Sequence, residues 1–95
     1  MTKFQLNNKL SELYKIKNCL YGDANSPDIL LIDDWNRLMD LAVDNKLNIY
    51  FSLDVVTCTN NKDVIESNEF MSDHESPQAA TRFAIAMALV KLKEV

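Results

Sequence analysis

The sequence predicts an α+β fold, in which a small antiparallel β-sheet is layered with about three helices in the order α-α-β-β-α. Apolar residues recur at helical spacing near both ends of the chain, whereas in the middle they alternate with polar residues at a period of two. The 95 residues, 47% of them apolar and 25% charged, are ordinary composition for a globular protein. We therefore expect one domain over residues 1–95, small enough that a partner chain would add stability.

The first helix is predicted over residues 5–21. Its apolar stripe repeats at spacings of three and four residues and comprises Leu6, Leu10, Leu13, Ile16 and Leu20. Gly22 supplies the stop, because glycine adopts the left-handed cap conformation without steric cost. Pro27 then excludes a helix interior from the connection, and whether Ile29 to Ile32 form a third strand is left open.

A second helix is predicted to begin at Asp33 or Asp34, whose carboxylates can accept hydrogen bonds from free backbone N–H groups. Asn45 is expected to end this helix in the left-handed conformation. The predicted buried face of the helix comprises Trp35, Leu38, Met39 and Ala42.

A strand follows the second helix, because apolar and polar residues alternate from Leu47 to Val56. The face that this pattern predicts to be buried comprises Leu47, Ile49, Phe51, Leu53 and Val55. Thr59–Lys62 contains two asparagines suited to a turn, which would return the chain through a polar second strand over Val64–Phe70. We place that second strand at the edge of the sheet, where charge discourages unwanted pairing.

The last helix is predicted from Pro77 to about Lys93, with Ser76 as its N-cap. It carries two opposed apolar faces, one of Phe83, Met87 and Val90 and the other of Ile85, Leu89 and Leu92. A helix that is apolar on opposed sides is buried on both. We expect the sheet on one side and, on the other, either the chain's own first or second helix or the same helix of a second copy in a homodimer.

Charge is distributed unevenly along the chain, whose net charge is −4. Residues 1–22 carry +3, residues 23–75 carry −9 and residues 76–95 carry +2. The basic ends can simply compensate the acidic middle within the folded chain. Alternatively, the middle presents an acidic face to a basic surface of a host protein, such as a nucleic-acid-binding channel. The residues predicted to form that partner-binding face are Asp33, Asp34, Asp40, Asp44, Glu66, Glu69, Asp73 and Glu75.

The sequence carries no enzyme signature. GxSxG, GxGxxG and P-loop motifs are missing, and a single glycine cannot build a loop that cradles phosphate. His74 has no partners at zinc-ligand spacing and is read as solvated, while Cys19 and Cys58 are read as reduced thiols without a neighbouring base. We therefore predict no enzymatic activity, no metal and no cofactor. Four lysines near the N-terminus, without arginine or interleaved aromatic residues, argue against direct nucleic-acid binding.

Two segments carry a family resemblance. IDDWNRLMDLAVDNKLNIYF is an acid-capped helix with an early tryptophan that runs into a strand, and ESPQAATRFAIAMALVKL is a capped, alanine-rich terminal helix. With Trp35 and Pro77 in these positions, the chain resembles the phage ABA sandwich family of small phage and prophage proteins, although its polar stretch from Asn60 to Glu75 departs from the pattern. The resemblance implies an α+β fold without enzymatic activity and a role as an accessory protein. Some small phage proteins block host proteins, as anti-CRISPR inhibitors do.

These observations predict a protein that acts by binding another protein through its acidic surface, in the cytoplasm of a host bacterial cell. Inhibition of a bacterial defence system is the sharpest version of this prediction. The alternative is a homo-oligomeric structural or assembly module, joined through Ile85, Leu89 and Leu92, that inhibits nothing. Membrane insertion and secretion are not expected, because the longest apolar run is FAIAMALV and the N-terminus lacks a signal sequence.

Overall fold

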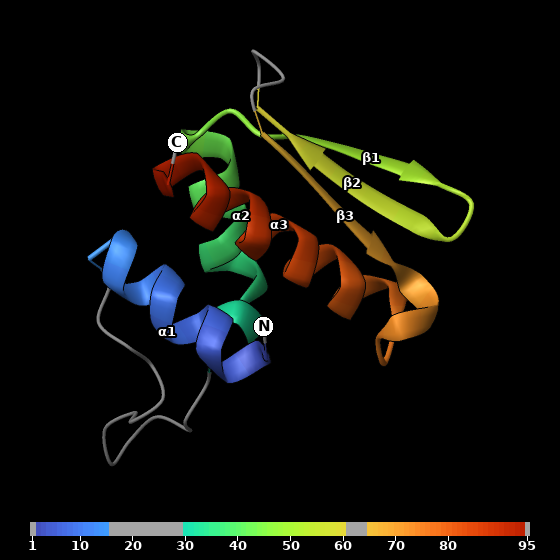
Figure 1. The fold of residues 1–95 in the computed structure, drawn as a ribbon, viewed down its shortest axis with the longest axis horizontal. Coiled ribbons are helices and arrows are strands. Elements are labelled where there is room, and N and C mark those ends of the chain that lie inside the picture. Colours follow the sequence, from blue (N-terminus) through green and yellow to red (C-terminus); the bar gives the residue numbers. More distant parts are fainter. Residues whose placement is uncertain (1, 16–29, 61–64, 95) are drawn as a thin grey trace.

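The computed structural model describes residues 2–15, 30–60 and 65–94, which form an α+β fold (Figure 1). Its helices are α1 (Lys3–Leu13), α2 (Trp35–Asp44) and α3 (Pro77–Glu94), with two short 3-10 turns, η2 (Leu31–Asp33) and η3 (Met71–Asp73). Its strands are β1 (Asn48–Ser52), β2 (Val55–Thr59) and β3 (Glu66–Phe70). The predicted fold class, with two helices before the sheet and one after it, is confirmed.

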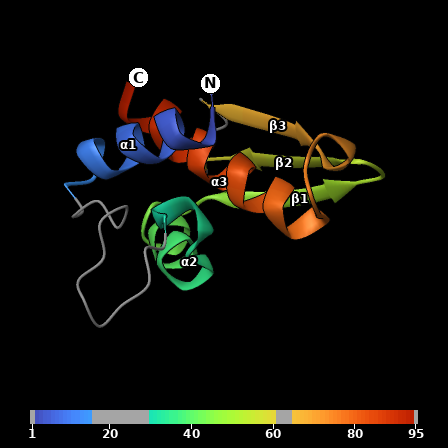
Figure 2. The ribbon, with the colours of Figure 1, turned by 90° about the horizontal axis from the view of Figure 1, so that it is seen from below.

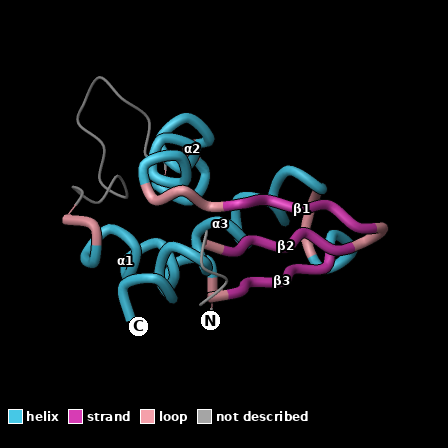
Figure 3. Tube along the Cα trace, turned by 90° about the horizontal axis from the view of Figure 1, so that it is seen from above, coloured by secondary structure: helices cyan, strands magenta, loops and turns pink. Residues whose placement is uncertain are grey.

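The helices gather at one end of the molecule and the sheet extends toward the other, while α3 belongs to both parts (Figures 2 and 3). α3 contacts α1 and α2, and it also contacts β2 and β3. The molecule is elongated as a result, with principal extents of 40, 28 and 22 Å. α3 is therefore the common support of the helical part and the sheet.

α3 begins where the sequence predicts. The Ser76 Oγ accepts a hydrogen bond from the Ala79 N–H at 3.0 Å, which satisfies one of the free donors of the first turn. Pro77 follows as the first helical residue, where no N–H is needed.

Both apolar faces of α3 are covered, which confirms the prediction from its sequence. Ile85 and Leu89 are fully buried, and Leu92 is partly buried against the same core. On the opposed face Val90 is buried and Phe83 and Met87 are partly buried. The chain itself covers both faces. Ile85, Leu89 and Leu92, which were predicted to serve either a dimer or helix packing, therefore pack within the chain.

α1 starts earlier and ends earlier than predicted. Thr2 and Gln5 form a capping box, in which the Gln5 N–H donates to the Thr2 Oγ1 at 3.2 Å and the Thr2 N–H donates to the Gln5 Oε1 at 2.9 Å. The predicted continuation of the helix is wrong at Tyr14 and Lys15, because the helix ends at Leu13 and Lys15 takes a left-handed φ of 55°, while residues 16–21 lie outside the described residues. The predicted stop at Gly22, with the stripe residues Ile16 and Leu20, lies outside the described residues.

The question of a strand from Ile29 to Ile32 is settled for its described part. Leu30 is extended and the chain then enters η2, so residues 30–32 join no strand. The Asn7 Oδ1 accepts the Ile32 N–H at 3.0 Å in a buried hydrogen bond. A side chain of α1, rather than a neighbouring strand, thus satisfies this buried backbone donor.

α2 begins at its predicted cap, because the Asp34 Oδ1 accepts the Arg37 N–H at 3.2 Å. Leu38 and Ala42 are buried as expected. Trp35 is 41% exposed, however, so its expected place in the core is wrong. Helical spacing gives the side on which a residue lies, but not whether a neighbouring element reaches that turn.

The end of α2 also differs from its prediction. Asn45 keeps a negative φ of −96°, and the left-handed residue is Lys46 with φ 55°. The Asn45 N–H still donates to the Leu41 carbonyl at 3.0 Å, so the helical bonding continues to Asn45, and the Leu47 N–H donates to the Ala42 carbonyl at 2.9 Å around the left-handed Lys46.

The sheet is antiparallel with strand order β1-β2-β3. The predicted single strand from Leu47 to Val56 is wrong, because the chain reverses at Leu53 and Asp54 and Ser52 pairs with Val55. Leu53 takes φ 48°, a conformation that costs a residue with a Cβ about 1–2 kcal/mol. This reversal produces the third strand of the sheet.

Asp54 connects the turn between β1 and β2 to η3 through hydrogen bonds. Its carboxylate accepts hydrogen bonds from the Ser72 N–H at 3.2 Å and the Ser72 hydroxyl at 2.7 Å. Its carbonyl accepts the Met71 N–H at 2.6 Å. β3 then forms the far edge of the sheet, which confirms the predicted edge position of the polar strand; the rest of the turn predicted after Asn60 lies outside the described residues.

Candidate protein-binding surfaces

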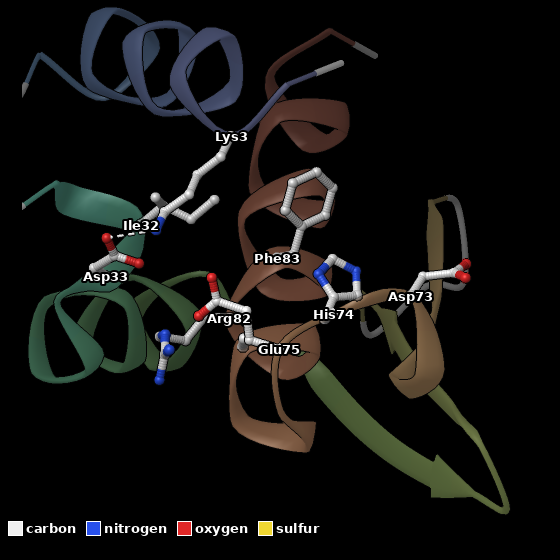
Figure 4. A pocket seen from close by; sticks show the side chains of 9 residues that line it. Lys3, Ile32, Asp33, Asp73, His74, Glu75, Arg82 and Phe83 are labelled. Atoms are coloured by element: carbon white, nitrogen blue, oxygen red, sulfur yellow. Dashed lines mark ion pairs between the residues drawn. The ribbon is translucent and has the colours of Figure 1, made fainter.

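A hollow of about 200 Å³ lies between the first turn of α1, η2 and the loop that precedes α3 (Figure 4). The residues that line it are Lys3, Ile32, Asp33, Asp73, His74, Glu75, Ala79, Arg82 and Phe83. Figure 4 shows the His74 and Phe83 rings side by side, with Lys3 reaching toward Asp33 from α1. Segments that are far apart in the sequence thus form one site.

His74 is fixed in this site rather than solvated as predicted. Its Nε2 lies 2.9 Å from the Glu69 Oε1, and its side chain is only 16% exposed. Its ring centroid lies 5.1 Å from that of Phe83. Sequence reasoning missed the pair because Glu69 belongs to β3 and His74 to the following loop, and only the turn of η3 brings them together.

The hollow carries charges of both signs. Lys3 Nζ lies 2.8 Å from Asp33 Oδ2 and so closes one side with an ion pair. Asp73 and Glu75 are exposed and form no ion pair with the described residues. Arg82 lines the same hollow, and its buried Nε has no hydrogen-bond partner among the described residues.

The eight predicted partner-binding acids do not share one face. Three line the hollow, namely Asp33, Asp73 and Glu75. Glu69 adjoins it through His74, and Asp34 is occupied as the cap of α2. Asp40 and Asp44 are exposed on α2, and Glu66 stands at the start of β3, the end remote from η3. The acidic surface is therefore divided, with its densest part around the hollow.

A second candidate surface is the end of the sheet near the Leu53–Asp54 turn. The exposed apolar side chains there are Tyr50 (56%), Phe51 (64%), Leu53 (101%) and Phe70 (56%). Phe51 lies on the same face of the sheet as Val56, whereas Tyr50 and Phe70 lie on the opposite face. The alternating pattern predicted that Phe51 and Leu53 are buried, which is wrong because the chain reverses at Leu53 and α3 packs chiefly under β2 and β3. No glycine or asparagine stands in this turn, whose left-handed position is taken by Leu53, so the strongest local signal of a two-residue hairpin is missing.

Cys58 is buried in the core beneath the sheet. Burial raises the pKa of its thiol to about 12, because the charged thiolate is disfavoured there. A thiol held protonated at neutral pH is a poor nucleophile, so Cys58 serves packing. Burial likewise raises the pKa of Tyr14, whose hydroxyl donates to the Leu89 carbonyl at 2.7 Å.

Comparisons of the chain with known protein families, with curated proteins and with solved structures found no match. Within residues 2–15, 30–60 and 65–94, no three His, Cys, Asp or Glu side chains are grouped to hold a metal ion. None of the described helices combines the length and the apolar character that crossing a membrane requires.

Proposed function

We propose that the chain is a small phage or prophage accessory protein that acts by binding another protein, and that it inhibits a bacterial defence system in the manner of an anti-CRISPR protein. The resemblance of residues 1–95 to the phage ABA sandwich family supports the phage origin. The charged hollow supports the mode of action, which is recognition of a basic surface on the host protein.

One observation carries the binding proposal. Asp73 and Glu75 are exposed carboxylates on either side of His74, and they form no ion pair with the described residues. They stand at a hollow whose wall includes the Phe83 ring. Lysine or arginine side chains of the partner fit this arrangement, because their cations pair with the two carboxylates, which lie on opposite sides of the His74 ring in Figure 4, while their stems lie on apolar surface.

The binding proposal is tested by a double charge reversal, Asp73→Lys with Glu75→Lys. The matched control is Asp40→Lys with Asp44→Lys, which changes net charge equally on exposed positions of α2. Each exposed ion pair is worth up to about 1 kcal/mol, so we expect roughly tenfold weaker binding for the first variant and a much smaller loss for the control.

Binding is measured by affinity capture from bacterial lysate at low and high salt, followed by titration of the partner that is identified. We expect the wild-type complex to weaken as salt rises. Equal losses in both variants would mean that general charge, not the hollow, determines binding.

Inhibition is tested separately, by the plating efficiency of a phage that a host defence system restricts. Expression of the wild-type chain is expected to raise plating, and Asp73→Lys with Glu75→Lys is expected to abolish the rise. A binding partner unrelated to defence, together with unchanged plating, would contradict inhibition and leave the binding mode standing.

A further inference from the structure

The two edge strands of the sheet, β1 and β3, differ in how they are protected against pairing with another strand. β3 carries Glu66 and Glu69, and the Lys91 Nζ of α3 donates to the Glu66 carbonyl at 2.7 Å. β1, the other edge, contains no charged residue, proline or glycine, and its Tyr50 and Phe51 are 56% and 64% exposed. Proteins normally protect edge strands with charge, proline or a covering element, because an open edge can pair with another strand. The described part of the chain protects β3 and leaves β1 open.

The register shows which backbone groups of β1 face its open edge. Ser52 and Val55 close a two-residue turn, so this pair exchanges backbone hydrogen bonds, and every second pair along an antiparallel ladder does the same. The backbone groups of Tyr50 therefore point toward β2. Those of Ile49 and Phe51 point away from β2, toward the edge.

These outward groups match a second copy of the same strand. In an antiparallel pair centred on Tyr50, Ile49 of one copy lies opposite Phe51 of the other, and both residues have outward N–H and C=O groups. The two Tyr50 side chains then face each other as the closer, non-hydrogen-bonded pair, on the same face as Asn48 opposite Ser52. In this register each aromatic side chain lies opposite an aromatic or aliphatic side chain, and Asn48 lies opposite the polar Ser52. None of the paired residues is charged, so the pairing brings no like charges together.

We infer that β1 pairs with β1 of a second copy, in the register centred on Tyr50, to give a continuous six-stranded sheet in a symmetric homodimer. This interface replaces the one predicted on α3, whose apolar faces the chain itself covers. The pairing does not depend on the charged hollow. A two-fold axis through Tyr50 requires the same patch on both copies, and β1 supplies it.

The area sets the strength of this dimer. An aromatic side chain contributes roughly 150–250 Å² when buried, so even complete cover of the exposed parts of Tyr50 and Phe51 in both copies would remove no more than roughly 500 Å². Stable complexes bury about 1,200–2,000 Å² in total, so the dimer is weak, and it forms at high rather than low protein concentration. Each copy carries a net charge of −4, so salt should strengthen the dimer by screening repulsion, whereas it should weaken partner binding at the hollow.

The inference is tested with Tyr50→Glu and Tyr50→Lys, measured by analytical ultracentrifugation over a wide concentration range. Tyr50 is exposed in the single chain, so both variants should keep the wild-type circular dichroism. In a dimer of either variant, like charges at position 50 face each other, so the affinity should fall about tenfold or more. An equimolar mixture of the two variants should restore the dimer, because a glutamate then faces a lysine. A wild-type chain that stays monomeric at all concentrations and salts overturns the inference.

The register is tested by disulfide formation in a chain carrying Cys19→Ser. Facing residues of a non-hydrogen-bonded pair have Cα atoms about 4.5 Å apart, within the range that a disulfide spans. Tyr50→Cys should therefore give a covalent dimer under mild oxidation, whereas Asn48→Cys should not, because Asn48 faces Ser52 of the second copy. Equal crosslinking of both variants, or none in either, overturns the register.

Discussion

The sheet has a covered part and an open part, although the same strands run through both. Val56, Cys58 and Ser67 are almost fully buried, whereas Phe51, on the same face of the sheet, is 64% exposed. In the register, Phe51 pairs with Val56, so an exposed and a buried residue are direct neighbours on one face of the sheet. Alternation within a strand thus identifies a face, but the position of the covering helix decides where along that face the core ends.

The covered part should be highly sensitive to charge, which gives the largest expected effect. Leu89→Asp places a carboxylate in a fully buried position on α3 and should destabilise the protein by more than about 4 kcal/mol, enough to unfold a small domain. The control is Leu53→Asp, at a fully exposed position, which should change stability by no more than about 0.5 kcal/mol. Urea denaturation followed by circular dichroism measures both; similar losses would contradict the division of the sheet.

A pair of truncations sharpens the comparison within one strand pair. Val56→Ala removes two buried methyl groups and should cost about 2 kcal/mol once the cavity is included. Phe51→Ala removes a larger side chain opposite Val56, yet it should cost less than about 1 kcal/mol because Phe51 is 64% exposed. Urea midpoints of the two variants test this order, and a larger loss for Phe51→Ala would show that the open part is packed in solution.

Alkaline pH should act on the covered part through Cys58. Its pKa is raised from 9.0 to about 12 in the folded protein, so the native state keeps a proton that the unfolded state loses. This contribution to stability is complete below about pH 9 and falls between about pH 9 and pH 12, by up to about 1.4 kcal/mol per pH unit. Thermal unfolding of Cys58→Ala between pH 8 and pH 11 should show a shallower loss than the wild type; parallel curves would contradict the raised pKa.

The smallest effect is expected at the turn of the open part. Leu53 has φ 48° and an entirely exposed side chain, so Leu53→Gly relieves backbone strain without removing a contact. We expect a gain of about 1 kcal/mol, measured as a higher melting temperature. Ser52→Gly, one residue earlier in β1, is the control and should destabilise, because Ser52 lies in the regular strand.

Most of the helices could be predicted because their signals are local. Ser76 and Pro77 mark the start of α3 within two residues, and Asp34 marks the start of α2. The two opposed apolar faces of α3 predicted that the helix is buried on both sides, whether by its own chain or by a second copy. The candidate site was only partly predictable. Asp33, Asp73 and Glu75 could be predicted from the sequence as surface acids, but not that the fold places all three around one hollow.

By itself, the sequence determined the fold class, the two-sided burial of α3 and the edge position of the polar strand, because periodicity and capping act over a few neighbouring residues. Tertiary structure decided the reversal at Leu53 and Asp54, where leucine rather than glycine or asparagine takes the left-handed conformation and hydrogen bonds from Ser72 to Asp54 hold the turn. It also decided that Phe51 is exposed and that His74 meets Glu69. These outcomes depend on how far one helix or strand extends over another. The spacing of residues within a helix or strand does not determine that distance.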